Sequence, residues 1–149
     1  MGYQALEHIA EAVADKIRGV LRGAFRQVTV TQATNAAQLW QDIPNAANLP
    51  VCVVAVQSGD YEDRALRRDL RLMIVIATPW QRNPGRNAAS VWRLCDQVTS
   101  LFLPRRGDYP AVCGIEFVPE TITPGESPED VCVCAITLSG TEFLTEDTK

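Results

Sequence analysis

The sequence predicts an α+β fold, in which an antiparallel or mixed sheet of about five strands packs against two long helices. Two observations predict it. Apolar residues recur at helical spacing in two segments, and short apolar runs rich in β-branched residues lie mostly next to one another along the chain. Because 149 residues suffice for one ordinary core and no linker or repeat divides them, a single domain (1–149) is expected.

Two segments carry their apolar residues on one helical face. The first runs from Tyr3 to Phe25, and its acids come early while its arginines come late, as the helix dipole favours. The second follows Asn87, a residue suited to capping a helix, and closes before Pro104. These segments are the two predicted helices.

Five short runs predict strands: Val28–Thr31, Val51–Val56, Leu66–Thr78, Ala111–Val118 and Val131–Leu138. The second and third are expected to pair antiparallel across a loop at Ser58–Ala65. Pro119–Asp130 is rich in proline and acids, which predicts a long projecting connection. Asn35–Pro50 contains several Asn and Pro residues and is expected to be mostly loop.

Charge and composition narrow the classes of function. The net charge of -4, from 14 basic and 18 acidic side chains, argues against counterion-driven nucleic-acid binding as the main activity. Charged residues interrupt the first apolar stretch, so no export signal is expected, and the run Leu72–Ala77 is too short to span a bilayer, which needs about 20 residues. The chain is expected to be cytosolic when made, with its five cysteines reduced.

The residue types needed for catalysis are scarce. None of the common hydrolase, metalloprotease or nucleotide-binding motifs occurs. The single histidine, His8, is expected to be solvated or to contact a partner rather than to act as a base. A small cysteine-dependent enzyme using Cys95 or Cys113 is kept as an alternative, to be tested by thiol labelling.

Cysteine spacing raises the question of a metal site. Cys132 and Cys134 would point to the same face of a strand, where Cys52 or Cys113 could approach them. Zinc ligands usually come from loops with C-x-x-C spacing, whereas these cysteines lie in valine-rich runs. They are interpreted as small buried apolar residues, and neither metal nor cofactor is expected.

Acidic residues crowd two segments, one holding Asp60, Glu62 and Asp63 and the other holding Glu116, Glu120, Glu126, Glu129 and Asp130. Such loops mostly stay solvated and resist non-specific association, so subunit contacts are the second interpretation and catalysis the third.

The run Leu66–Thr78 begins charged and ends apolar. In a strand, Arg67, Asp69 and Arg71 would project to one side and Arg68 to the other. Because a buried unpaired arginine is costly, this half is expected to extend beyond the helix-covered core. Its alternating charges either discourage pairing with other strand edges or meet charges of another subunit, and both interpretations stay open.

The order of these features resembles the tail terminator proteins (also called tail completion or minor tail proteins) of long-tailed bacteriophages and prophages. The likeness is one of pattern and length over Leu6–Leu144. It is carried by the opening helix, an apolar strand with an acidic loop, and the segments RALRRDLRLMIVIATPW, NAASVWRLCDQVTSLF and DVCVCAITLSGTEFL.

The resemblance implies a non-enzymatic α+β subunit without a cofactor. Its expected assembly is a homo-oligomeric ring, commonly a hexamer, on the end of the tail tube, where it stops tube polymerisation and offers a surface for joining the head. Its partners would be the tail tube protein and a head–tail connector or neck protein, and DNA would pass through the channel without specific binding. The expected location is the virion tail, after assembly in the host cytoplasm. Another neck or baseplate adaptor is the alternative.

Under this resemblance, two groups of residues are predicted to form contacts. The predicted subunit interface comprises Arg64, Arg67, Arg68, Asp69 and Arg71. The predicted contacts with tube or head-joining proteins are Asp60, Glu62, Asp63, Trp80, Arg82, Arg86, Glu120, Glu126, Glu129 and Asp130.

Overall fold

A computed structural model describes residues 2–32, 50–79, 84–108, 110–125 and 131–144, with only the backbone of residues 84–90. Its elements, in chain order, are α1 (Leu6–Val20), β1 (Gln27–Val30), β2 (Val51–Glu62), β3 (Arg67–Pro79), α3 (Pro84–Ser100), β4 (Ala111–Val112), β5 (Ile115–Glu116), β6 (Val118–Pro124) and β7 (Val131–Phe143).

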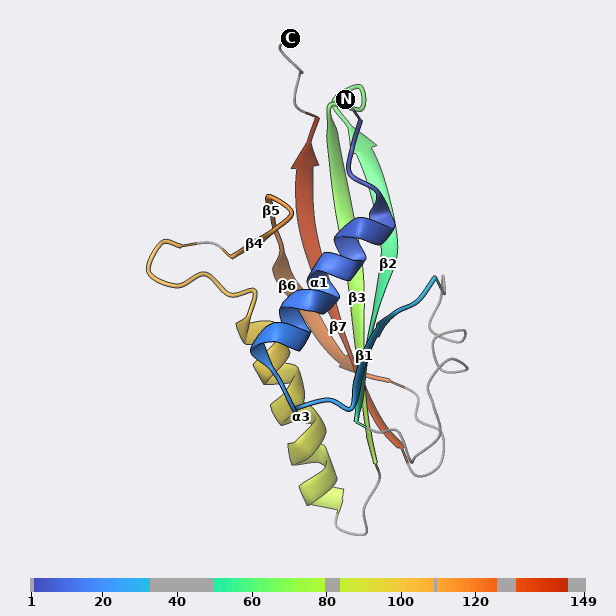
Figure 1. Ribbon diagram of the computed structural model, residues 1–149, viewed down its shortest axis with the longest axis vertical. Coiled ribbons are helices and arrows are strands. Elements are labelled where there is room, and N and C mark those ends of the chain that lie inside the picture. The colour runs from blue at the N-terminus through green and yellow to red at the C-terminus, as the bar shows by residue number, and fades with distance from the viewer. Residues whose placement is uncertain (1, 33–49, 80–83, 109, 126–130, 145–149) are drawn as a thin grey trace.

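The five long strands form one sheet in the order β1-β2-β3-β7-β6, and β4 and β5 form a separate small hairpin. The pair β1–β2 is parallel and the other pairs are antiparallel, so the sheet is mixed. Both helices lie against the same face of the sheet (Figure 1). The predicted α+β class, with a mixed five-stranded sheet and two helices, is confirmed.

Neither helix is long. They have 15 and 17 residues, so the expectation of two long helices is not confirmed. The first ends at Val20 rather than Phe25, because Leu21 leaves the helical conformation and Gly23 turns the chain with a φ of 81°. The second begins at Pro84, ahead of the expected cap Asn87, as suits a proline at the first helical position. Within the described part of the chain, no helix is long and apolar enough to cross a membrane.

Two predicted loops are strands instead. β2 continues through Ser58 to Glu62 and pairs with β3 along its whole length, so the expected loop shrinks to a tight turn at residues 63–66. Residues Pro119–Pro124 of the connection that was expected to project belong instead to the edge strand β6. The predicted strand Ala111–Val118 is broken by a turn in which Cys113 and Gly114 have positive φ.

Strand register sorts the side chains onto two faces. Even-numbered residues of β3 and β7 face the helices, where they form the main core with α1 and α3. The opposite face, here called the back face, holds a second buried cluster that includes Val53, Val75 and Val133.

The back face changes along the strands. We call residues 51–56, 72–79 and 131–138 the proximal half of the sheet, and residues 58–62, 67–71 and 139–143 the distal half. The proximal half is apolar and largely buried on both faces.

Candidate interaction surface

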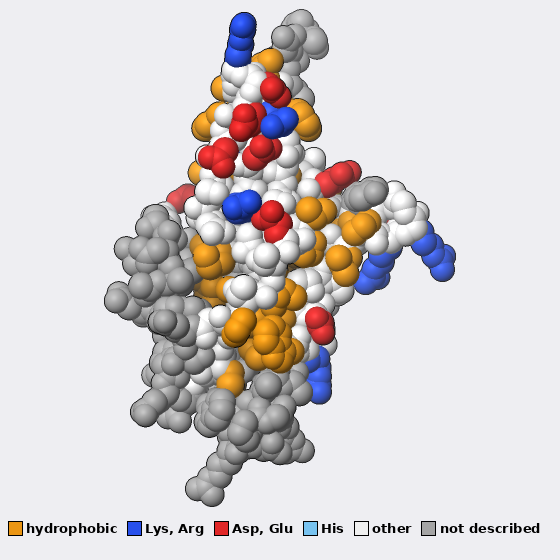
Figure 2. All heavy atoms as spheres, turned by 180° about the vertical axis from the view of Figure 1, so that it is seen from behind, with side chains coloured by type: hydrophobic (Ala, Val, Ile, Leu, Met, Phe, Trp, Pro, Cys, Tyr) orange, Lys and Arg blue, Asp and Glu red, His pale blue; other side chains and the backbone are white. Residues whose placement is uncertain are grey.

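The distal half of the back face is built from three rows of side chains. Register places Ser58, Arg71 and Ser139 in one row, Asp60, Asp69 and Thr141 in the next, and Glu62, Arg67 and Phe143 in the third. Figure 2 shows charged side chains gathered at this end of the back face, with hydrophobic side chains nearer its middle. The predicted alternation of Arg67, Asp69 and Arg71 on one side of β3 is therefore confirmed.

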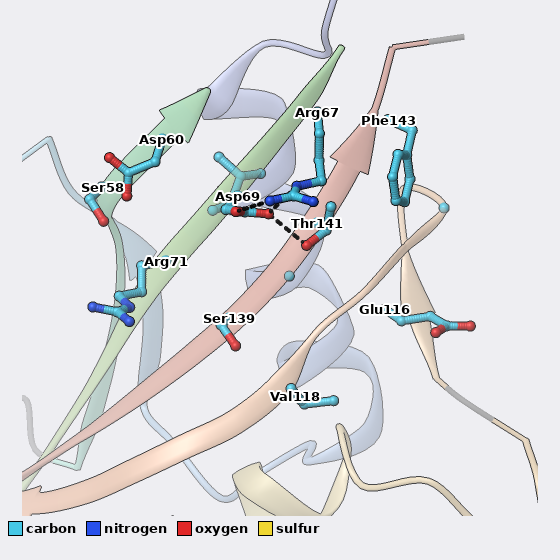
Figure 3. A pocket seen from close by; sticks show the side chains of 13 residues that line it. Ser58, Asp60, Arg67, Asp69, Arg71, Glu116, Val118, Ser139, Thr141 and Phe143 are labelled. Atoms are coloured by element: carbon cyan, nitrogen blue, oxygen red, sulfur yellow. Dashed lines mark hydrogen bonds and ion pairs between the residues drawn. The ribbon is translucent and has the colours of Figure 1, made fainter. Parts of the chain in front are cut away.

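Most of the charges on β3 already have partners inside the subunit. Arg67 lies 3.3 Å from an oxygen of Asp69 and 3.4 Å from one of Asp63, and the Thr141 hydroxyl donates to Asp69 at 2.8 Å (Figure 3). Arg71 Nε lies 3.0 Å from Glu120. These pairs are partly exposed, so each contributes at most about 1 kcal/mol. Their main effect is to hold the side chains in fixed positions.

Four charged residues of this region lack such partners. The side chains of Asp60, Glu62 and Glu116 are exposed and form no ion pair or hydrogen bond with the described residues. The same is true of Arg64, which lies in the tight turn between β2 and β3 with a φ of 57°. These are the charges available to a partner.

Arg68 points to the helix face, where it is buried. It is 5% exposed and its partner Glu142 is 8% exposed. Arg68 Nη2 lies 2.6 Å from Glu142 Oε1 and donates to the carbonyl of Gln4 at 2.9 Å, and its guanidinium lies 4.6 Å from the centroid of the Tyr3 ring. The expectation that this half of the strand extends beyond the core is thus wrong for Arg68. A buried arginine is tolerated here because it is paired.

The buried pair anchors residues 2–5, which we call the N-terminal strap. The backbone N–H of Gln4 donates to Glu142 at 3.1 Å, and its side-chain amide donates to the carbonyl of Cys113 at 2.8 Å. The Tyr3 hydroxyl donates to the carbonyl of Ala65 at 2.6 Å, and desolvation raises the Tyr3 pKa. The strap therefore ties the β2–β3 turn to β7 and to the β4–β5 turn.

Sequence reasoning missed Glu142 as the partner of Arg68. One signal was present: Glu142 has the same parity as Ile136 and Leu138, which places it on the core side of the last strand. A carboxylate at a core position requires a cation or several donors.

A hollow of about 930 Å³ lies on the distal back face. It is bounded by β2, β3 and β7, by the β4–β5 hairpin and by the start of β6. Asp60 and Glu116 lie on opposite sides of it, with Arg67 and Asp69 between them (Figure 3). Beneath it, Gly140 lets β5 approach β7, because a Cβ atom there would come within 2.7 Å of Phe117 and 2.8 Å of Ile115.

The cysteines and the histidine do not form a reactive cluster. Burial raises the pKa of Cys52 to about 12 and also raises that of Cys113. Cys95 donates to Cys134 across 2.7 Å, and this hydrogen bond together with burial raises the Cys95 pKa. The same hydrogen bond lowers the pKa of Cys134, but that thiol is fully buried in the core. A nucleophilic thiol needs both a lowered pKa and access to solvent. His8 is exposed on α1, and the described residues contain no group of three or more potential metal ligands.

Several predicted contact residues lie outside the described residues: Trp80, Arg82, Glu126, Glu129 and Asp130. Apart from Pro50, the predicted loop Asn35–Pro50 also lies outside them. Arg86 lies in the first turn of α3, where only the backbone is described.

Comparison with known proteins gives no family assignment. No known protein family matches the chain, and no curated protein matches it.

Proposed function

We propose that the chain is a structural subunit of a bacteriophage tail, which assembles into a ring on the end of the tail tube, ends tube polymerisation and offers a surface for joining the head. The observation that supports this function best is the distal back face: an exposed mixed-charge surface on a long, firmly paired part of the sheet. The sequence pattern described above resembles tail terminators and supplies the ring as the form of assembly.

The character of the surface favours a protein partner over a small substrate. Its lining mixes carboxylates, arginines, hydroxyls and the exposed Phe143, and its β3 charges are held by internal pairs. Charges of both signs on a rigid surface select a partner's orientation and suppress wrong pairings, which is what an assembly subunit needs. The raised thiol pKa values described above give the alternative of a cysteine enzyme no support.

The predicted interface residues then divide by role. Arg67, Asp69 and Arg71 shape the surface through their internal pairs, and Arg68 holds the strap inside the subunit. The unpaired charges identified above would meet neighbouring copies, the tube protein or the connector. A surface that pairs with a different patch of the next copy is heterologous, and it closes into a ring when the rotation between copies allows.

Electron microscopy of particles made with and without this protein tests the proposal. With the protein, a ring of its copies should lie at the head-proximal end of a tail of uniform length. Without it, tubes should vary in length and fail to join heads. The same protein found at the neck or baseplate would favour the adaptor alternative instead. Uniform tails that join heads in its absence would refute the function.

A further inference from the structure

A second charged feature lies on the connection between α3 and β4. Residues Arg105–Asp108, here called the arginine turn, form a closed turn in which the N–H groups of Arg105 and Asp108 each donate to the other's carbonyl at 2.9 Å. Arg106 and Gly107 have φ values of 52° and 80°, the combination typical of a two-residue hairpin turn. This connection projects away from the sheet (Figure 1). The turn is thus a well-defined protrusion.

The arginine turn carries charges that the subunit does not neutralise. Arg105 and Arg106 are exposed, and their side chains form no ion pair or hydrogen bond with the described residues. With Asp108, the turn has a net charge of +1. Two adjacent free guanidinium groups on a protrusion are suited to binding carboxylates of another molecule.

The hollow on the distal back face has the complementary charge. Three carboxylates (Asp60, Asp69, Glu116) and two arginines (Arg67, Arg71) line it, which gives a net charge of -1. Asp69 is engaged by Arg67 and Thr141. The carboxylates left free are those of Asp60 and Glu116, one on each side (Figure 3).

We propose that the arginine turn of one copy docks into the hollow of the next, with Arg105 and Arg106 meeting Asp60 and Glu116. Each copy offers one protrusion and one hollow on different patches, so the contact is heterologous and can repeat from copy to copy. This inference deepens the proposed function, because it names the surfaces through which the ring would close.

Paired charge-reversal variants of the whole chain test this contact. The turn variant carries Arg105→Glu and Arg106→Glu, and the hollow variant carries Asp60→Arg and Glu116→Arg. A matched control carries Arg22→Glu and Arg26→Glu, which make the same charge change at two exposed positions of the segment after α1. Association of the purified protein is measured by sedimentation from micromolar to near-millimolar concentration, in low and high salt with a reductant present, and circular dichroism checks folding.

The wild type and the control should self-associate in low salt and dissociate in high salt. Each reversed variant alone should associate roughly 10- to 100-fold more weakly, because attraction becomes repulsion at two positions. An equal mixture of the two variants should recover association in even-numbered assemblies, since each turn then finds a hollow of opposite charge.

Three results would overturn the contact: a wild type that stays monomeric throughout, variants that associate like the wild type, or folded variants whose mixture fails to associate. These measurements use the purified protein alone. If the association measurements contradict the contact, microscopy still decides whether the protein lies at the end of the tail. If microscopy finds the protein elsewhere, the contact between copies is unaffected.

Discussion

The proximal and distal halves of the sheet share the strands β2, β3 and β7 but bury different surfaces. In the proximal half, Val53, Val75 and Ala77 are buried on the back face almost as fully as Ile74 and Ile76 are on the helix face. In the distal half only the helix face is buried, and even there Arg68 and Glu142 take part. The abrupt change of charge along β3 therefore marks where the back face becomes exposed, not where the core ends.

Two β-bulges lie at the border between the halves. The register of β2 shifts between Val56 and Ser58, and that of β6 shifts between Pro119 and Thr121. Arg71 lies at this border, opposite Ser58, and its guanidinium reaches Glu120, the extra residue of the second bulge. Bulges redirect side chains, and here one of them supplies the partner of the first exposed arginine.

The largest difference in stability is expected between substitutions of Arg68 and Arg71, which lie on opposite faces of β3. Arg68→Met should lower the free energy of unfolding by about 3–5 kcal/mol, because it leaves the buried Glu142 carboxylate without its cation. Arg71→Met, the matched control, should cost less than about 1 kcal/mol, since its pair with Glu120 is largely exposed. Urea unfolding measures both.

The double variant Arg68→Met with Glu142→Leu should recover most of the stability lost by Arg68→Met alone, because no unpaired charge remains buried. Equal losses for Arg68→Met and Arg71→Met would show that the two faces of the distal half do not differ as described.

The next largest change in stability is expected from substituting a glycine of β7, and a glycine of α1 serves as its control. Gly140→Ala should destabilise the fold by about 1–3 kcal/mol, because the new methyl group would press on the buried side chains of Phe117 and Ile115. Gly19→Ala in α1 meets no atom within 4 Å and should stabilise the helix by about 0.5–1 kcal/mol. Thermal unfolding separates the two signs. A neutral Gly140→Ala would mean that β5 does not rest closely on the distal half.

The smallest expected effect is a loss of stability at high pH, caused by the buried thiol of Cys52 in the proximal half. Burial raises the Cys52 pKa from 9.0 to about 12. The contribution of the neutral thiol to the free energy of unfolding is therefore complete below pH 9, and it is lost as pH rises toward 12. By pH 10.5 the unfolding free energy should fall by up to about 2 kcal/mol on this account. Cys52→Val should show a shallower decline above pH 9 in urea titrations. An unchanged slope would place the thiol in water rather than in the core.

Much of the fold could be predicted because periodicity is local. Apolar spacing located both helices and most of the strands, and the alternation in β3 assigned its faces correctly. Strand lengths were underestimated where polar residues continue a strand on an exposed face. Ser58–Glu62 and Glu120–Thr123 have the composition of loops, but pairing with β3 and β7 holds them in the sheet.

The candidate site was less predictable because it depends on long-range pairing. The sequence indicates that charges gather near Asp60–Asp69, but not that Arg67 and Arg71 find partners within the subunit. Nor does it place Glu116 across a hollow from Asp60, since that arrangement depends on the order of β2, β3 and β7 in the sheet and on the packing of the separate β4–β5 hairpin against β7.

The N-terminal strap has a consequence for how the chain folds during synthesis. Residues 2–5 leave the ribosome before the rest of the described chain, yet their binding site is complete only when β7 delivers Glu142, near the far end of the described chain. Contacts so distant in sequence form slowly. The strap should therefore dock late, and until then Arg68 remains solvated on an unfinished sheet.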